Sequence, residues 1–268
     1  MKTSKKSFSL PAMAGTVILF LMVLSGGMLW PGRLMADDPG LPFQVGEKLI
    51  FELRWSFIPA GTAVLEVMPM EKINGEEAYH FVMTASTNSF VDKFYKVRDR
   101  IDAYADLSMT RSLYYRKQQR EGRSKKDIVV QFDWKANQVS YSNSGKKKDP
   151  VSIAPGTFDP FSVFYFSRTF DWSRNSSMEQ PVTDGKKLIM GKANLKAKEK
   201  IKVPVGEFET YLFEPGIENI GGVFEKKKGA KIEVWVTADH RKIPVRLKSE
   251  VSVGSFIAEL VSIEGADK

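Results

Sequence analysis

The chain contains no cysteine and only two histidines, His80 and His240, among its 268 residues. The absence of cysteine excludes disulfide bonds, lipid attachment through an N-terminal cysteine, cysteine-based catalysis and zinc clusters of His and Cys. An exported domain without disulfides must be held by its own core, and this chain is long enough to bury a large one.

Recognisable catalytic and nucleotide-binding motifs are also missing. The sequence has no Gly-x-Ser-x-Gly elbow, phosphate loop, calcium loop or dinucleotide fingerprint. His80 falls within an expected strand and His240 in an expected turn, so both are interpreted as structural. Asp99 and Asp102 are three residues apart, which places them on opposite faces of a strand and argues against a carboxylate pair. We therefore predict a non-enzymatic protein with no catalytic residue, no bound metal and no cofactor.

A single long apolar run lies near the N-terminus, from about Ala12 to Leu24. A lysine-rich head precedes it, a small-residue break at residues 25–27 follows it, and Ala36 stands at the expected cleavage position before Asp37. This order is typical of a secretory signal, so residues 1–36 are predicted to be a signal peptide and residues 37–44 a short linker. An uncleaved anchor is the alternative, because residues 12–30 approach the ~20 residues that span a bilayer. Both interpretations predict an exported protein: either free in the periplasm of a Gram-negative-type bacterium, or anchored in the inner membrane and facing the periplasm.

The net charge depends strongly on this segment. The whole chain carries a formal charge of +8, which falls to +4 without residues 1–36, since these contain three lysines, one arginine and no acid. Nucleic acid is not expected as a partner of an exported protein with this charge. Anionic lipid or polysaccharide remains a candidate partner.

Most of the remaining sequence alternates with the period of β-strands. Leu49, Phe51, Leu53 and Trp55 share one face of a strand, and Asn74-Gly75 is a strong hairpin signal. Turn signals recur about every ten residues without β-α-β alternation. We predict one all-β domain over residues 45–265: an antiparallel, strongly curved sheet with an open barrel-like or sandwich architecture. Residues 173–186 are expected to be a polar connector, and residues 59–61 a turn.

Two short helices are expected, at Ser89–Tyr95 and at about Pro160–Arg168. The second lies in GTFDPFSVFYFSRTF (residues 156–170), which holds five Phe and one Tyr. Asp159 is suited to cap this helix and Pro160 to occupy its first position. The helix is predicted to be either a plug over the sheet or a wall of an apolar cavity. The residues expected to form that hydrophobic plug or ligand-binding wall are Phe158, Phe161, Phe164, Tyr165, Trp55 and Trp235.

Basic residues gather around several glycine-containing turns. They are typical of solvated hairpin tips that protect sheet edges. A functional alternative is that several tips converge and contact lipid phosphates or acidic glycans. The candidates for such anionic contacts are Arg116, Arg120, Lys146, Lys147, Lys148 and Arg168.

Five segments occur in an order that resembles a bacterial envelope family, the domain of unknown function 3108. They are GEKLIFELRW (46–55), PAGTAVLEV (59–67), DPFSVFYFSR (159–168), VPVGEFETY (203–211) and IEVWVTADHRKIPVRLKS (232–249). The similarity extends over about residues 43–265. It implies an exported, largely β-sheet protein of unproven activity and supplies no catalytic residues.

These observations favour a periplasmic cell-envelope protein that binds a lipid-like or other hydrophobic ligand within its curved sheet. The alternative is a structural or assembly factor that contacts another envelope protein or a polysaccharide and whose interior is filled. A hydrolase is the third and least favoured hypothesis. Membrane contact through the N-terminal segment is expected if that segment is not cleaved.

Overall fold

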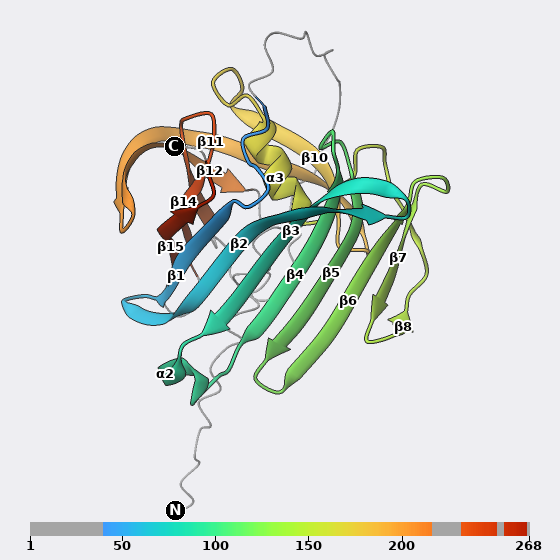
Figure 1. Cartoon of the computed structure of the whole chain (residues 1–268), viewed down its shortest axis with the longest axis horizontal. Coiled ribbons are helices and arrows are strands. Elements are labelled where there is room, and N and C mark those ends of the chain that lie inside the picture. The colour runs from blue at the N-terminus through green and yellow to red at the C-terminus, as the bar shows by residue number, and fades with distance from the viewer. Residues whose placement is uncertain (1–39, 216–231, 251–254, 267–268) are drawn as a thin grey trace, which may run out of the picture.

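The computed structural model describes residues 40–215, 232–250 and 255–266. The described strands join into one curved antiparallel sheet of 15 strands (Figure 1). Along this sheet the order is β10-β11-β12-β13-β14-β15-β1-β2-β3-β4-β5-β6-β7-β8, with β9 paired to β7. The predicted antiparallel all-β fold with a curved, open sheet is therefore confirmed. The predicted signal peptide lies outside the described residues.

The first part of the chain forms an antiparallel meander with one short helix. Its elements are β1 (Lys48–Trp55), β2 (Ile58–Ile73), β3 (Glu76–Thr87), α2 (Ser89–Asp92), β4 (Arg98–Asp106), β5 (Ser112–Glu121), β6 (Ser124–Asp133), β7 (Gln138–Asn143), β8 (Lys146–Lys147) and β9 (Val151–Ser152).

The second part begins with a helix and adds six strands. Its elements are α3 (Ser162–Thr169), β10 (Ser177–Thr183), β11 (Leu188–Val203), β12 (Gly206–Pro215), β13 (Ile232–Thr237), β14 (Pro244–Glu250) and β15 (Ser255–Glu264). The last strand pairs with the first over its whole length, from Lys48 opposite Glu264 to Trp55 opposite Phe256. This pairing joins the two halves into one sheet.

The sheet is curved, but among the described strands no ladder of backbone hydrogen bonds joins its two ends, β10 and β8. Phe158, just before α3, forms a parallel bridge with Val182 of β10. The turn after β10 packs onto the inner side chains of β6 and β7: a Cβ at Gly185 would lie 2.7 Å from Val130 and 3.1 Å from Tyr141. The two ends of the sheet therefore meet through side chains and α3.

Because neighbouring strands are antiparallel, their turns alternate between two ends of the sheet. We call the end that carries the β1–β2 turn, α2, the β5–β6 turn and the β7–β8 turn the α2 end (Figure 1). The opposite end, the α3 end, carries the β4–β5, β6–β7 and β13–β14 turns and is crossed by α3.

The core lies on the inner face of the curve. The largest cluster joins the inner side chains of β3–β7 to α3 and includes Phe81, Tyr115, Val130, Phe161 and Tyr165. A second cluster brings together β1, β14 and β15 and includes Leu49, Phe51, Val245 and Leu260. Both clusters use alternate residues of each strand, as the sequence periodicity predicted.

Both predicted helices are present, although each is shorter than expected. The sequence pattern extended α2 to Tyr95, but its last helical residue is Asp92; the pattern began α3 at Pro160, but its first helical residue is Ser162. Asn88 caps α2, its side chain accepting from the N–H groups of Phe90 and Val91.

Two predictions along the chain are wrong, the turn at residues 59–61 and the strand-free connector at residues 173–186. Residues 59–61 lie in β2 rather than in a turn, because the chain reverses at Ser56, whose φ is +54°. Gly61 is needed there for close packing: a Cβ would lie 2.0 Å from the carbonyl oxygen of Ser86 on β3.

The predicted connector at 173–186 contains β10. This strand buries Met178, Val182 and Thr183, and its proline is tolerated because β10 lies at the edge of the sheet. Its polar composition hid it as a strand.

Candidate ligand-binding site

The aromatic segment that stood out in the sequence is fixed at its beginning by Asp159. One carboxylate oxygen of Asp159 accepts hydrogen bonds from the N–H groups of Phe161 and Ser162 at 2.7 and 2.9 Å. The other accepts from the hydroxyl of Ser112 on β5 at 2.6 Å. The predicted side-chain cap is confirmed, and it also ties α3 to the sheet. Burial raises the pKa of the Asp159 carboxyl, while the bonds from Ser112 and the backbone oppose that shift.

The face of α3 that turns toward β3 is packed with rings. Tyr165 is stacked on Phe81 with their centroids 3.9 Å apart, and Phe43 meets both rings edge to face. Phe158 stacks on Phe166 at 4.9 Å. Aromatic pairs of this kind add about 0.5–1.5 kcal/mol each beyond area burial. On this side α3 closes over side chains.

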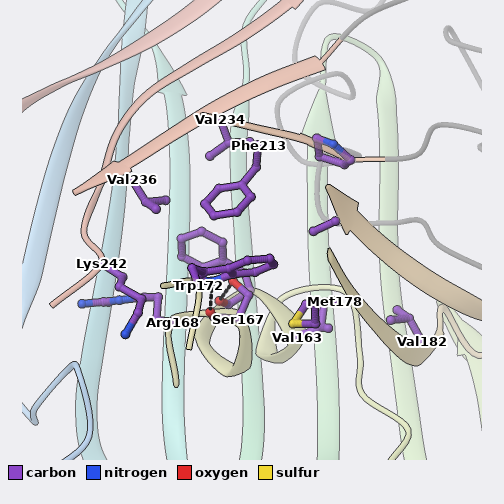
Figure 2. A pocket seen from close by; sticks show the side chains of 13 residues that line it. Val163, Ser167, Arg168, Trp172, Met178, Val182, Phe213, Val234, Val236 and Lys242 are labelled. Atoms are coloured by element: carbon purple, nitrogen blue, oxygen red, sulfur yellow. Dashed lines mark hydrogen bonds between the residues drawn. The ribbon is translucent and has the colours of Figure 1, made fainter. Parts of the chain in front are cut away.

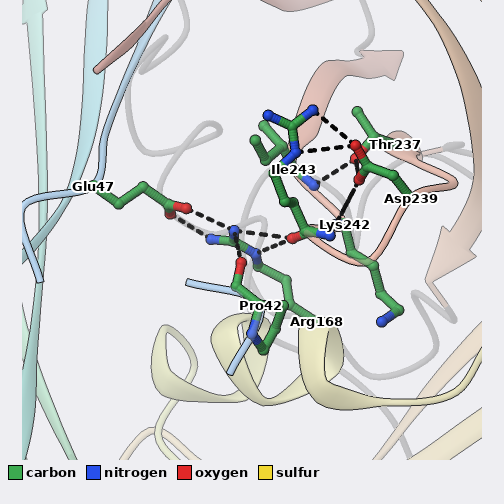
Figure 3. A network of polar contacts seen from close by, with 8 residues as sticks. Pro42, Glu47, Arg168, Thr237, Asp239, Lys242 and Ile243 are labelled. Atoms are coloured by element: carbon green, nitrogen blue, oxygen red, sulfur yellow. Dashed lines mark hydrogen bonds and ion pairs between the residues drawn. The ribbon is translucent and has the colours of Figure 1, made fainter. Parts of the chain in front are cut away.

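The end of α3 is held by a buried ion pair. Arg168 is 1 % exposed and Glu47 2 % exposed, and the guanidinium donates to the Glu47 carboxylate with an Nη2–Oε2 distance of 2.8 Å. The same guanidinium donates to the carbonyl oxygens of Pro42 and Arg241 (Figure 3). Arg168 therefore joins α3 to the segment before β1 and to the β13–β14 turn. The prediction that Arg168 contacts an external anion is wrong, because its charge is already neutralised inside the protein.

The side of α3 that faces β12 and β13 is less completely filled. A cavity of about 100 Å³ lies there, mostly apolar in lining (Figure 2). Its lining includes Phe164 and Ser167 of α3, Trp172 and Met178 after it, Val182 of β10, Phe213 of β12, Val234 and Val236 of β13, and Lys242.

A second cavity of about 60 Å³ lies beside the first. It is lined by inner residues of the opposite part of the sheet, among them Phe51, Leu65, Met83, Leu247 and Ala258, together with Phe161. Phe164 and Val234 line both cavities, so the ring of Phe164 stands between them. The two cavities form one discontinuous apolar space along α3.

Lys242 is the polar group at the rim of the larger cavity. It is half-buried, and its amine makes no ion pair or hydrogen bond within the part of the chain that the structure describes. Burial lowers the pKa of Lys242, while the nearby Asp171 carboxylate opposes that shift. Its backbone lies in the left-handed region, with φ +45°, which is unusual for a residue with a side chain.

The turn that carries Lys242 is held by Asp239. The Asp239 carboxylate accepts hydrogen bonds from the Thr237 hydroxyl at 2.6 Å and from the Arg241 side chain (Figure 3). Thr237 in turn accepts from the N–H of Ile243. This network holds the turn that places Lys242 beside the larger cavity.

The residues predicted to form the hydrophobic wall are only partly brought together. Phe161 and Phe164 line the cavities, whereas Phe158 and Tyr165 are fully buried packing residues. The two tryptophans do not belong to this wall. Trp235 points to the other face of β13, where it donates to Glu199 and lies against Arg246, and Trp55 lines neither cavity. Strand alternation places Val234 and Val236, not Trp235, next to α3.

Several lining residues escaped the sequence analysis. Trp172 and Met178 lie six residues apart just after α3, whereas Phe213 comes from the distant β12, and no short motif connects the three. Met178 lay in the segment interpreted as a polar connector. The alternation of Val234 and Val236 within IEVWVT was a usable signal for β13.

The predicted anionic-contact residues also separate into different roles. Arg116 forms an ion pair with Asp127 at 2.8 Å, and Arg120 donates to backbone carbonyls of Gln119 and Lys126. Lys146, Lys147 and Lys148 are exposed around the β7–β8 turn. No ion pair involves these three lysines among residues 40–215, 232–250 and 255–266.

A buried charged cluster lies inside the sheet toward the α2 end. Asp99, Lys117 and Glu121 are each 5 % exposed or less. Burial raises the pKa of Asp99 to about 7, with Glu121 adding to the shift and the N–H of Arg120 opposing it. Burial lowers the pKa of Lys117 to about 8, against the effect of Asp99 and Glu121.

Asp99 belongs to this buried cluster and Asp102 does not, as their spacing in the sequence predicted. Asp102 lies on the other face, 2.9 Å from His80 and bonded to Arg100. Although burial raises the pKa of Asp102, the bonds from His80 and Arg100 hold it at about 2. Within the described ranges, no group of three or more His, Cys, Asp or Glu side chains is placed to hold a metal ion.

Comparison with known families agrees with the sequence pattern. Residues 50–261 match the model of a family described as "Protein of unknown function (DUF3108)". The chain belongs to this family. No curated protein matches this DUF3108 protein. Among the residues that the structure describes, no helix combines the length and hydrophobicity that a membrane span requires.

The DUF3108 protein was also compared with solved structures. A β-barrel-like protein of the DUF1849 family from Brucella abortus aligns with a TM-score of 0.55 and 9 % identity, over 82 % of this chain and 97 % of its own. A putative lipoprotein from Parabacteroides distasonis aligns over 85 % of this chain and 100 % of its own, with 10 % identity and a TM-score of 0.36. The first similarity supports the curved, barrel-like fold and nothing beyond it.

Proposed function

We propose that this DUF3108 protein is an exported, non-enzymatic envelope protein that binds a lipid-like or other apolar ligand between α3 and the sheet. The observation that carries the proposal is the pair of apolar cavities on either side of Phe164, which are lined by residues from nine strands and α3. Ligand sites are typically apolar concavities with a few placed polar groups. Lys242 at the rim is such a group.

Export is proposed on the basis of the N-terminal sequence, with its basic head, apolar run and small residues before Asp37. The absence of enzymatic activity is proposed because no catalytic motif occurs in the sequence. The buried Asp99 and Glu121 line neither of the two cavities.

The shape of the space restricts the ligand. The two cavities measure about 100 and 60 Å³, less than the roughly 300–1,000 Å³ of typical small-molecule sites. A narrow chain that displaces the Phe164 ring and runs through both cavities matches this space better than a ring system. An anionic group at the end of such a chain would lie near Lys242.

The same volumes favour a second function. An interior that is nearly filled, with α3 tied to the sheet at both ends, suits a structural or assembly factor that works through its surface. In that case α3 is a plug, and Phe164 simply fills space between α3 and β13.

The first test is native mass spectrometry of gently purified protein, followed by titration with a fluorescent fatty acid. Under the proposal, a lipid-sized adduct is present and the probe binds. The variant Ala193→Phe places a ring in the larger cavity and should weaken probe binding at least tenfold. Its matched control is Ala197→Phe, since Ala197 is also half-buried on β11 but lines neither cavity.

A protein free of adducts that takes up no fatty acid would contradict ligand binding and favour the assembly factor. Equal weakening by Ala193→Phe and Ala197→Phe would also contradict the proposed site. An activity against a lipid or glycan ester that depends on one carboxylate would overturn the non-enzymatic assignment.

A further inference from the structure

Three phenylalanines are exposed at the α2 end. Phe57 in the β1–β2 turn is 79 % exposed, Phe90 in α2 is 57 % exposed and Phe94 just after α2 is 66 % exposed. The rings of Phe90 and Phe94 contact each other with centroids 5.7 Å apart. Large rings at such exposure are unfavourable in water, and clustered exposed apolar residues indicate an interaction site.

The two turns that carry these rings are neighbours. Asn88, which caps α2, donates its backbone N–H to the carbonyl of Ala60 and its side-chain amide to the carbonyl of Pro59. Phe57 is two residues before Pro59, so the chain segments that carry the three rings lie at one corner of the sheet (Figure 1).

Next to this corner lies a row of basic turns. The N–H of Gly122 in the β5–β6 turn donates to the carbonyl of Lys96, and the N–H of Ser144 in the β7–β8 turn donates to the carbonyl of Asp127 on β6. These bonds place the α2 segment and the two hairpin tips side by side along the α2 end.

Eight cations of this row are exposed and make no ion pair within the described part of the chain. They are Lys93, Lys96, Arg123, Lys125, Lys126, Lys146, Lys147 and Lys148. The nearby acids Asp92 and Asp127 are already neutralised by Arg98 and Arg116.

The charge of the molecule is distributed asymmetrically. The chain after residue 36 has a formal net charge of +4, and these eight cations alone carry +8, so all its other residues together carry −4. These eight unpaired cations give the α2 end a positive surface.

We propose that the α2 end docks on an anionic lipid bilayer, with Phe57, Phe90 and Phe94 entering the interface and the row of lysines facing lipid phosphates. Surface-bound proteins use this combination of apolar side chains and basic residues. A soluble acidic polymer would account for the lysines but not for three exposed rings on adjacent convex turns. Docking is independent of the cavities beside α3 and goes beyond the proposed ligand binding.

The test is flotation of the exported, purified protein with vesicles of phosphatidylcholine, with and without phosphatidylglycerol. Binding is expected with the anionic vesicles and should weaken as salt is added. Replacing Lys146, Lys147 and Lys148 by Gln should lower the partition constant about 100-fold. Replacing the three phenylalanines by Ser should weaken binding at least tenfold while leaving its salt dependence unchanged.

The matched control is Lys72→Gln, Lys135→Gln and Lys202→Gln together. These exposed lysines lie toward the α3 end, so the same loss of charge should affect binding much less. The proposal is overturned if the wild-type protein ignores anionic vesicles, or if both lysine triples weaken binding equally. It is also overturned if the phenylalanine variant binds as well as wild type, which would indicate a purely electrostatic surface for polyanions.

Discussion

At the scale of single residues, Asp159 shows how a completely buried carboxylate is accommodated. Both of its oxygens accept hydrogen bonds, from the backbone of α3 and from Ser112 of β5. Burying such a group without donors would cost several kcal/mol. Asp159 therefore acts as a cap and as a link between the helix and the sheet.

We predict that Asp159→Ala lowers the free energy of unfolding by about 2–4 kcal/mol, because two N–H groups and the Ser112 hydroxyl lose their acceptor. Asp159→Asn retains one acceptor oxygen and should cost about 1 kcal/mol. Urea denaturation measures both. Loss of ligand or vesicle binding by Asp159→Asn at unchanged stability would contradict this structural role.

Asp99 is the second residue whose environment has a measurable consequence. Its pKa of about 7 is above the value of about 3.9 in an unfolded chain, so the folded protein retains a proton that the unfolded chain releases. The free energy of unfolding should then fall as the pH rises from about 4 to about 7.

We predict that Asp99→Asn reduces this fall by about 2–4 kcal/mol, since an amide does not ionise. The measurement is urea denaturation at several pH values between 4 and 7. Lys117 does not interfere, because its own contribution begins near pH 8. Asp149→Asn, at an exposed position, is the control and should follow the wild-type profile. Parallel profiles for Asp99→Asn and wild type would show that Asp99 ionises normally.

At the scale of elements, α3 is too short to be stable alone and depends on its contacts. Asp159 holds its beginning, the stack of Tyr165 on Phe81 holds its middle, and Arg168 holds its end. The same three attachments leave Phe164 facing the cavities. The helix is consequently a fixed wall, and any opening for a ligand has to come from side chains such as Phe164.

We predict that Glu47→Ala destabilises the protein by about 3–5 kcal/mol, because the buried guanidinium of Arg168 loses its carboxylate. The double variant Glu47→Leu, Arg168→Met removes both charges and should be less destabilised than Glu47→Ala. Thermal and urea unfolding of the single and double variants measure the difference. A double variant that is less stable than Glu47→Ala would show that apolar side chains cannot replace this ion pair.

At the scale of the whole molecule, the sheet separates two kinds of surface. The α3 and α2 ends lie at opposite ends of the strands (Figure 1). The α3 end carries the buried Arg168–Glu47 pair, whereas the α2 end carries exposed rings and unpaired lysines. The antiparallel meander produces this separation, because it sends every second turn to the same end. The proposed ligand site and the proposed bilayer contact can therefore be altered independently.

The sequence by itself determined the strand periodicity, the family and the presence of a short helix after Asp159. Alternation in segments such as Leu49–Trp55 depends only on which side chains avoid water, and the Asp159-Pro160 cap depends only on neighbouring backbone groups. Such local patterns are visible in one dimension.

Only the tertiary structure decided which surfaces these elements form. Arg168 resembled an exposed cation until Glu47, 121 residues away, was found beside it. Trp235 and Val234 are adjacent in the chain, and strand alternation puts them on opposite faces of β13. Only the fold shows that the face of Val234 lines the cavities and that the face of Trp235 meets Glu199. Partners so distant in sequence are set by the register and curvature of the strands, which depend on all the side chains packed between them.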